Sequence, residues 1–216
     1  MNQWIRARSD EQKQSRETQI LMAAGILFRQ HDFKEVTLVT IAKAAGFTRS
    51  NIYRYFGSKE EIFLVIMEQE FDQFAKRVNK VLNSQECQSP EDLVRILVGN
   101  LIQQETLLEL LPIMNSSLER YSGKDQVLAF KQALHSTVGS MIVAIRLVFP
   151  RLSEAAILDI LMGFISLAAG LYPLTKLTPV HQEIRLEHPE LSSLFFEFQE
   201  RMETLLLRIV QGVLKQ

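Results

Sequence analysis

Apolar residues recur at helical spacing along most of the chain. The clearest short case is the segment 38–45, where four apolar side chains fall at positions i, i+3, i+4 and i+7 of one helical face, namely Leu38, Ile41, Ala42 and Ala45. Beyond residue 90 no run of alternating β-branched residues predicts a strand. The pattern therefore predicts an all-α fold. We expect about nine helices, at residues 10–30, 38–45, 49–56, 58–82, 91–105, 106–118, 124–148, 153–171 and 189–214.

The ends of the first helices carry local signals as well. Thr37 and Thr48 each precede a helical pattern, and a threonine hydroxyl accepts hydrogen bonds from the free N–H groups of a first turn. Gly46 follows the segment 38–45, where a tight turn demands a positive φ. Ser58 and Glu61 have the spacing of a capping box, which begins a long helix.

Two short helices joined through Gly46 have the layout of a helix-turn-helix. Ala42 is small where the second helix crosses the first, and Ile52 can bury the inner face of the second helix. The polar side chains of that helix then project outward, and such a helix fits the major groove of DNA. These outward residues are Thr48, Arg49, Ser50, Asn51, Tyr53 and Arg54.

The charge of the whole chain argues against a nucleic-acid partner, but its distribution does not. The 216 residues include 24 Lys+Arg and 25 Asp+Glu, for a formal net charge of −1. Residues 1–60 carry a net charge of +4, and the remaining residues carry −5. The neutral total is therefore an average over a basic, motif-bearing part and an acidic part.

Other features argue against several classes of protein. The single cysteine, Cys87, cannot form an intramolecular disulfide, and the polar N-terminus lacks the apolar region of a signal peptide. The most apolar stretch, at 160–174, is shorter than the roughly 20 residues that a membrane span needs. The chain lacks a Gly-x-Ser-x-Gly elbow and a phosphate-binding loop. We expect a cytoplasmic, soluble protein that is not an enzyme and has no cofactor, metal or membrane partner.

The run from Gly46 to Phe63 resembles the signature of the tetracycline-repressor (TetR) family of bacterial transcription factors. That signature joins a glycine turn, an aromatic-rich end of the recognition helix and a "Ser-Lys-Glu" start of the fourth helix. Residues 37–46 also match its upstream pattern "Thr-x-x-x-Ile-Ala-x-x-Ala-Gly". The resemblance covers about residues 12–65. It implies a helix-turn-helix DNA-binding domain at 1–57, running into the fourth helix, and a helical effector-binding and dimerisation domain at 58–216.

The resemblance also implies roles for individual residues. Arg49 is expected to read a guanine edge, while Tyr53 and Lys59 are expected to bind phosphates. The residues expected to face DNA are Thr37, Thr40, Thr48, Arg49, Ser50, Asn51, Tyr53 and Lys59. Arg54 is either a contact or a solvated charge.

Residues around this motif have less specific interpretations. Tyr55 and Phe56 are expected to be core aromatics that pack the recognition helix onto the first and fourth helices. Near the N-terminus, three cations form either an arm that touches DNA or an unstructured tail, namely Arg6, Arg8 and Lys13.

For the C-terminal part, the resemblance implies a homodimer held through the last two helices, at about 153–171 and 189–214. Small residues would let two helices approach closely, namely Gly163, Ser166, Ala169 and Gly170. Either helix could instead belong to the core of one chain. A two-fold dimer would place two recognition helices on successive major-groove faces, so a palindromic operator is expected.

The resemblance further implies that the C-terminal part binds a small effector. Asn100 and Gln104 lie beside the apolar stripe of the helix at 91–105, and His135 adjoins apolar residues of the helix at 124–148. A buried polar group needs a partner, which either an effector or an internal hydrogen bond supplies. We expect a small apolar or amphipathic effector.

The leading hypothesis is a sequence-specific, dimeric repressor that an effector releases from its operator. The alternative is an architectural or protein-partnered DNA-binding protein without a small-molecule effector. A helical adaptor without a DNA function would require the motif to be vestigial.

Overall fold

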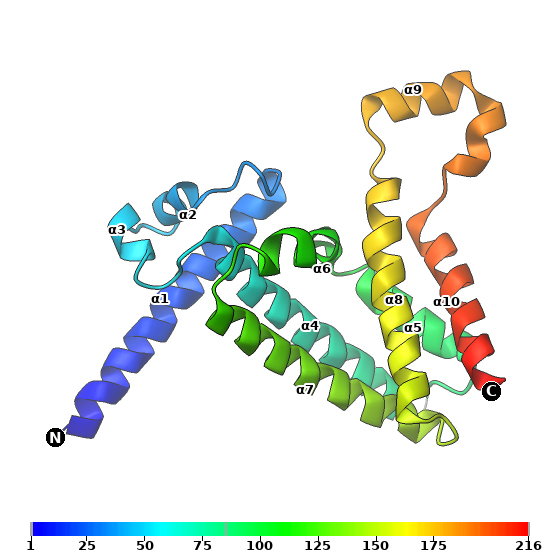
Figure 1. The fold of residues 1–216 in the computed structure, drawn as a ribbon, viewed down its shortest axis with the longest axis horizontal. Helices are drawn as coiled ribbons and strands as arrows, with labels where there is room; N and C mark the ends of the chain where they lie inside the picture. The colour runs from blue at the N-terminus through cyan, green and yellow to red at the C-terminus, as the bar shows by residue number, and fades with distance from the viewer. Residues whose placement is uncertain (1, 85, 216) are drawn as a thin grey trace. The chain divides into compact units, whose positions relative to one another are not determined.

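The computed structural model describes residues 2–84 and 86–215, with side chains from residue 12 onward. The described residues form helices and no strands, so the all-α prediction is confirmed (Figure 1). The α-helices are α1 (Asn2–Gln30), α2 (Leu38–Ala44), α3 (Arg49–Ile52), α4 (Lys59–Asn83), α5 (Pro90–Leu101), α6 (Glu105–Leu110), α7 (Lys124–Val148), α8 (Glu154–Thr175), α9 (Pro179–Glu187) and α10 (Phe198–Leu214). Two 3-10 segments, η1 (Leu111–Ile113) and η3 (Pro189–Leu194), and a π segment, η2 (Met114–Glu119), complete them.

Residue contacts divide the chain into two compact units. The first unit comprises Met1–Gln69 and Ile113–Gln132, and the second comprises Glu70–Pro112 and Ala133–Gln216. Helices α4 and α7 each continue from one unit into the other. The boundary at residues 57/58 that the sequence suggests lies inside the first unit, at the turn before α4.

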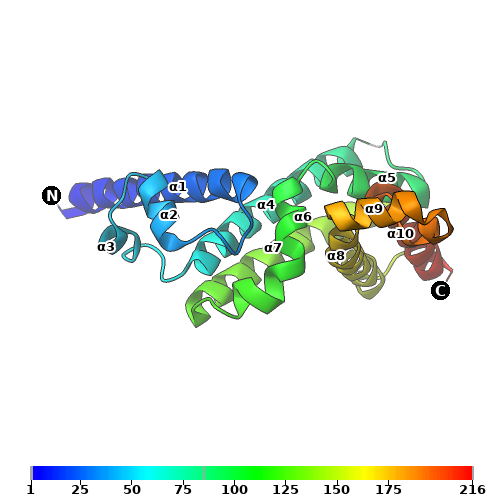
Figure 2. The ribbon, with the colours of Figure 1, turned by 90° about the horizontal axis from the view of Figure 1, so that it is seen from above.

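The core of the first unit holds its short helices in place. Helix α2 packs against α1 and against α3, and both short helices lie along one side of α1 (Figure 2). Four side chains from α1, α2 and α3 are fully buried or nearly so, namely Ile20, Ala24, Ile41 and Ile52. Phe63 adds its ring to those of Phe28 and Phe33, at centroid distances of 5.1 and 5.2 Å. Because helices of four to seven residues are unstable alone, this packing stabilises them.

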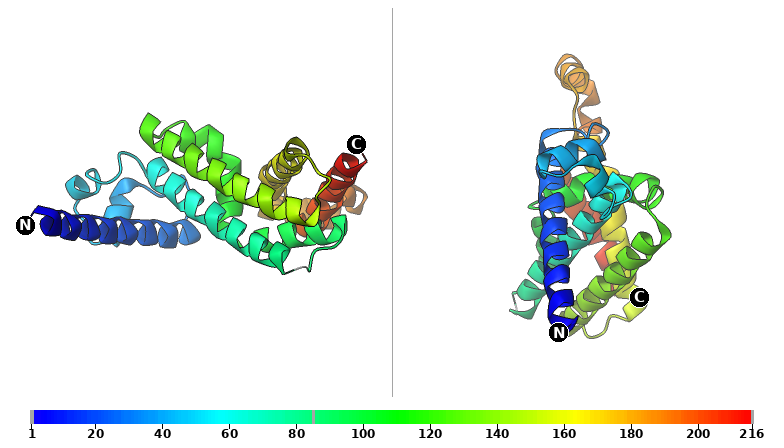
Figure 3. Two further views of the ribbon diagram at one scale, coloured as in Figure 1. Left: turned by 90° about the horizontal axis from the view of Figure 1, so that it is seen from below. Right: turned by 90° about the vertical axis from the view of Figure 1, so that its left-hand side faces the viewer.

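In the second unit, α10 packs against both α8 and α5 (Figure 3). Phe74 of α4 stacks on Phe164 of α8, with ring centroids 5.5 Å apart. Gly163 allows the close approach of α8 and α10, because a Cβ at residue 163 would lie 2.9 Å from Cδ1 of Ile209. One of the small residues expected at a dimer interface is therefore used within a single chain.

Several helix boundaries differ from the prediction. Helix α1 begins at Asn2 and not near residue 10, and the side chains of Arg6 and Arg8 lie outside the described residues. The helix expected at 106–118 is divided into α6, η1 and η2, because Pro112 has no N–H to donate and disrupts a regular α-helix.

The prediction also differs from the structure between residues 172 and 197, whereas the rest of the last predicted helix is confirmed as α10. The helix expected at 189–214 is a 3-10 segment followed by α10, with an extended residue, Phe195, between them. The stretch between the helices expected at 153–171 and 189–214, where no helix was predicted, contains α9. Thr178 caps this helix by accepting from the backbone N–H of His181, and Pro179 occupies its first turn, where the missing N–H costs nothing.

Helices α7 and α8 are long and apolar enough to cross a membrane by length and composition alone. Within the second unit, however, α8 buries five side chains, among them Ile157, Ile160 and Phe164. On α7, Lys131 pairs with Glu119 at 2.6 Å. Apolar helices of this kind are also typical of the core of a soluble protein.

Candidate nucleic-acid interface

The turn between α2 and α3 depends on Gly46. Its φ is 74°, its N–H donates to the carbonyl of Lys43 (3.2 Å), and the N–H of Phe47 donates to the carbonyl of Ala42 (2.8 Å). These two hydrogen bonds form a Schellman motif. A Cβ at residue 46 would meet no atom within 4 Å. Glycine is therefore required by the backbone conformation and not by a lack of space.

The first turn of α2 is fixed by two threonines. The hydroxyl of Thr37 accepts from the backbone N–H of Thr40 (3.1 Å), and the hydroxyl of Thr40 accepts from the backbone N–H of Thr37 (3.0 Å). The predicted cap is therefore confirmed, with Thr40 as its reciprocal partner. Both side chains are exposed.

Helix α3 is a single turn that presents polar side chains. The hydroxyl of Thr48 accepts from the N–H of Asn51 (3.3 Å) and lies 3.2 Å from the hydroxyl of Ser50. Thr48, Arg49 and Ser50 are exposed, whereas Ile52 on the opposite face is fully buried. The helix ends earlier than the expected residue 56, and residues 53–55 form a turn that brings Phe56 into the core.

The two expected phosphate-binding residues lie in different environments. Tyr53 has 48% of its surface exposed. Lys59 is half-buried, where its ammonium donates to the carbonyl of Phe33 and lies 4.1 Å from the centroid of the Phe33 ring. Burial lowers the pKa of Lys59 below its ordinary value. Lys59 thus joins α4 to the loop before α2, and its contact with DNA stays a prediction.

Glu61 connects three segments of the first unit. The sequence did not predict this role. Its backbone N–H donates to the hydroxyl of Ser58 (3.2 Å), as the capping pattern predicts. Its carboxylate, however, accepts from the N–H of Gly57 (2.7 Å) and from the N–H of Gly123 (3.1 Å). Glu61 therefore ties the end of the helix-turn-helix to the start of α7. The 62 residues that separate Glu61 from Gly123 leave no local signal of this contact.

The three effector candidates of the second unit do not share one environment. Gln104 is buried, with 4% of its surface exposed, and its Nε2 donates to the backbone and side chain of Glu70, both at 2.9 Å. Asn100 is half-buried and donates to the carbonyl of Ile96 (2.8 Å). His135 is exposed, so the expectation that it lies among buried apolar residues was wrong.

A shallow groove of about 290 Å³ lies beside Asn100. Arg77 of α4 lines the same groove, and two of its guanidinium nitrogens, Nε and Nη2, are buried without a hydrogen-bond partner among the described residues. The Oε1 atom of Gln104 is likewise buried and unpaired. Sequence reasoning missed Arg77, because its burial depends on tertiary packing.

Cys87 has none of the features of an activated nucleophile. It is buried, and its Sγ lies 3.9 Å from the carbonyl of Ser89. Burial raises the pKa of its thiol to about 11, so the thiol is protonated at neutral pH. The described residues also hold no group of three or more side chains able to bind a metal ion.

A recognition turn with polar residues outward, backed by a buried isoleucine and preceded by a Schellman turn, defines a helix-turn-helix DNA-binding regulator. Residues 20–66 match the family "Bacterial regulatory proteins, tetR family", and residues 68–216 match "Tetracyclin repressor-like, C-terminal domain". The chain therefore belongs to the TetR family of transcriptional regulators. The resemblance seen in the sequence is thereby confirmed.

Similar proteins support this assignment. An HTH-type transcriptional regulator of Bacillus subtilis, YfiR, is 34% identical over 70 residues, which are 32% of this chain and 34% of the relative. The matched stretch thus spans about a third of that relative.

Solved structures share the fold over nearly the whole chain. Thermus thermophilus FadR, a TetR-family repressor in complex with lauroyl-CoA, has a TM-score of 0.59 and 20% identity, over 91% of this chain and 94% of that one. A TetR regulator from Rhodococcus sp. RHA1 has a TM-score of 0.58 and 16% identity, over 94% and 97% of the two chains.

Proposed function

We propose that this DNA-binding regulator is a cytoplasmic, homodimeric repressor, which binds a palindromic operator and is released by a small amphipathic effector. The observation that carries the proposal is α3, whose Thr48, Arg49 and Ser50 are exposed while Ile52 anchors it. Arg49 can form two hydrogen bonds with a guanine edge in the major groove. Tyr53, Thr37 and Thr40 offer exposed hydroxyl groups for phosphates.

The DNA contact is tested by replacing Arg49 with alanine. The Arg49→Ala protein should lose about 1–3 kcal/mol of discrimination between its operator and a mismatched site, because one base-reading side chain is removed. Fluorescence anisotropy with duplexes from the DNA beside its own gene measures this, and sedimentation should show two chains per palindrome. Lys34→Ala removes an exposed cation outside α3 and serves as the control. Equal effects of the two substitutions would contradict the role of Arg49.

The outward face of α8 supports the homodimer. Four exposed residues follow each other at intervals of four along this helix, namely Leu158, Met162, Ser166 and Gly170. This spacing forms one stripe, with two apolar and two small side chains, on which a second helix can pack. In α10, by contrast, Met202, Leu206 and Val210 are buried within their own chain. Helix α8 therefore offers exposed apolar side chains that a second chain can cover.

The unpaired polar atoms of the second unit support an effector. A buried donor or acceptor without a partner costs about 1–3 kcal/mol, and a ligand that supplies the partner recovers that energy. Arg77 and Lys80 line the groove at Asn100 together with one carboxylate, Glu86. We therefore expect the ligand to carry an acceptor or a negative charge as well as apolar atoms. This is an amphipathic molecule.

The effector is tested by a thermal-shift screen and by mass spectrometry of molecules that co-purify. Lauroyl-CoA is one suitable amphipathic probe, because a repressor of this fold binds it. Arg77→Met should reduce the affinity for an acidic ligand by about tenfold or more, as expected when a charged hydrogen bond of about 1.5–3 kcal/mol is removed. Lys76→Met is the control, since Lys76 is exposed and pairs with Asp72 on the surface. A ligand that dissociates DNA equally from both variants would contradict the assigned groove.

A further inference from the structure

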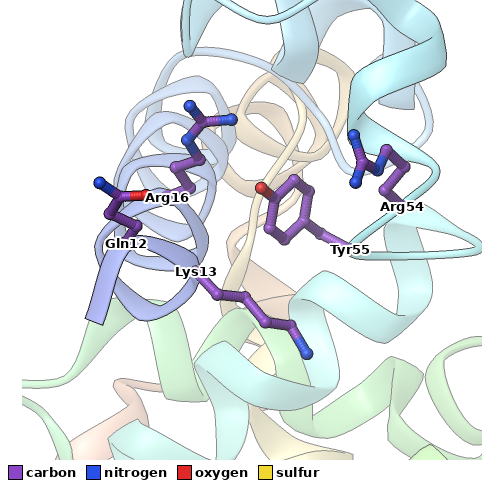
Figure 4. A pocket seen from close by; sticks show the side chains of 5 residues that line it. All are labelled: Gln12, Lys13, Arg16, Arg54 and Tyr55. Carbon is purple, nitrogen blue, oxygen red and sulfur yellow. The ribbon is translucent and has the colours of Figure 1, made fainter. Parts of the chain in front are cut away.

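A cationic cleft lies in the first unit between α1 and the turn that follows α3. Five residues line it, with a volume of about 300 Å³, namely Gln12, Lys13, Arg16, Arg54 and Tyr55. Figure 4 shows three of these side chains extending from α1 and two from the turn after α3. The cleft is thus formed by segments about 40 residues apart. For two of its residues the sequence left the role open, since Arg54 was either a DNA contact or a solvated charge and Lys13 belonged either to an arm that touches DNA or to an unstructured tail.

The positive charge of this cleft is not balanced by any negatively charged side chain among the residues that line it. Three of the five lining residues are cations, and none is a carboxylate. Lys13 lies 3.9 Å from Glu17 on the same helix, a loose surface pair. Within the described residues, Arg16 and Arg54 have no ion pair. Like charges around one cleft repel each other, so an anion bound between them would be favourable.

The position of Tyr55 adds a neutral donor to these cations. Its ring lies in edge-to-face contact with Phe47, at a centroid distance of 6.1 Å, which fixes its direction. Figure 4 shows the Tyr55 hydroxyl directed toward α1, between the cationic side chains. Guanidinium groups with a hydroxyl donor are well suited to the oxygens of a phosphate. Tyr55 was expected to be a core aromatic, but it is only half-buried.

We propose that this cleft binds a phosphate of the DNA backbone, through Arg16, Arg54 and the hydroxyl of Tyr55. Arg54 directly follows the C-cap of α3, five residues after Arg49. A duplex read by α3 therefore passes close to Arg54, and its backbone carries a phosphate at every nucleotide. The inference rests on the proposed contact of α3 with DNA, and it adds a clamp that strengthens binding without reading sequence.

The test compares two pairs of charge-removing substitutions. Arg16→Gln/Arg54→Gln should weaken binding to an unrelated 30-base-pair duplex and to the operator by the same factor, about tenfold or more at low salt. The slope of log affinity against log salt should fall by about 0.9 for each phosphate that the protein no longer neutralises. Arg29→Gln/Lys34→Gln is the matched control, because both cations are exposed and Arg29 lies about 20 Å along α1 from Arg16. Arg16→Lys/Arg54→Lys should keep most of the salt slope.

The outcomes separate this proposal from the function on which it rests. If the cleft pair and the control pair lowered DNA affinity by the same factor, the clamp would be overturned. The proposed DNA-binding function would not be affected by that result. If Arg49→Ala leaves sequence preference unchanged but the cleft pair weakens binding, the clamp holds and the recognition role of α3 fails. The cleft could instead bind free phosphate, and calorimetry with inorganic phosphate measures that binding. If the cleft substitutions abolished the binding of free phosphate but left the DNA affinity unchanged, the assignment of this cleft to a DNA phosphate would be overturned.

Discussion

The two compact units differ in how they satisfy their polar groups. In the first unit, Thr37, Thr48 and Glu61 all find partners within the unit, most of them within four residues. In the second unit, Gln104, Arg77 and Asn79 each contain buried polar atoms that lack a partner among the described residues. Among the described side chains, the unpaired buried atoms thus lie in the second unit, the unit in which we propose that an effector binds. This difference is what we expect if the first unit only has to hold α3 in place while the second unit binds an effector, as proposed above.

The largest expected effect comes from matched core truncations in the two units. Ile52→Ala and Ile157→Ala each remove part of a fully buried side chain, so each should lower the free energy of unfolding by about 2–5 kcal/mol. Only Ile52→Ala should also weaken DNA binding below its melting temperature, because Ile52 anchors α3. Urea denaturation and anisotropy titrations measure the two effects. If Ile157→Ala weakened DNA binding as much, the two units would not be functionally distinct.

A smaller effect is expected from two glycines that both have open space for a Cβ. Gly46→Ala should lower the free energy of unfolding by about 1–2 kcal/mol, because alanine is strained at the φ of 74°. Gly99→Ala, inside α5, should raise it by about 0.5–1 kcal/mol, because alanine is the better helix former. Differential scanning calorimetry on both variants gives the comparison. We expect the free energy of unfolding to fall for Gly46→Ala and to rise for Gly99→Ala. A fall for both variants would mean that packing at residue 99 outweighs helix propensity.

Much of the first unit could be predicted from sequence because its determinants are local. Thr37, Gly46 and Thr48 act on backbone groups within five residues, and short-range patterns report such contacts well. The same patterns predict the helix-turn-helix and its exposed face. They could not predict the ammonium contact of Lys59 with Phe33, which bridges 26 residues.

The second unit was less predictable because burial there depends on tertiary packing. His135 and Gln104 have similar apolar neighbours in sequence, yet His135 is exposed and Gln104 is buried. Pro179 lies in a stretch where no helix was predicted, although proline is favoured in the first turn of a helix. For Gly163 the sequence left both a dimer interface and the core of one chain open, and the structure places it against Ile209 of its own chain.

The contacts of Glu61 have a consequence for building chimeric regulators. A designer who joins the N-terminal part of this chain to another effector domain would naturally cut at residues 57/58. Such a graft would separate the N–H of Gly57 from the carboxylate of Glu61, and that carboxylate from the N–H of Gly123. The transferable module is therefore discontinuous, consisting of residues 1–69 together with 113–132. Modularity in this protein follows the packing of its helices and not the order of its sequence.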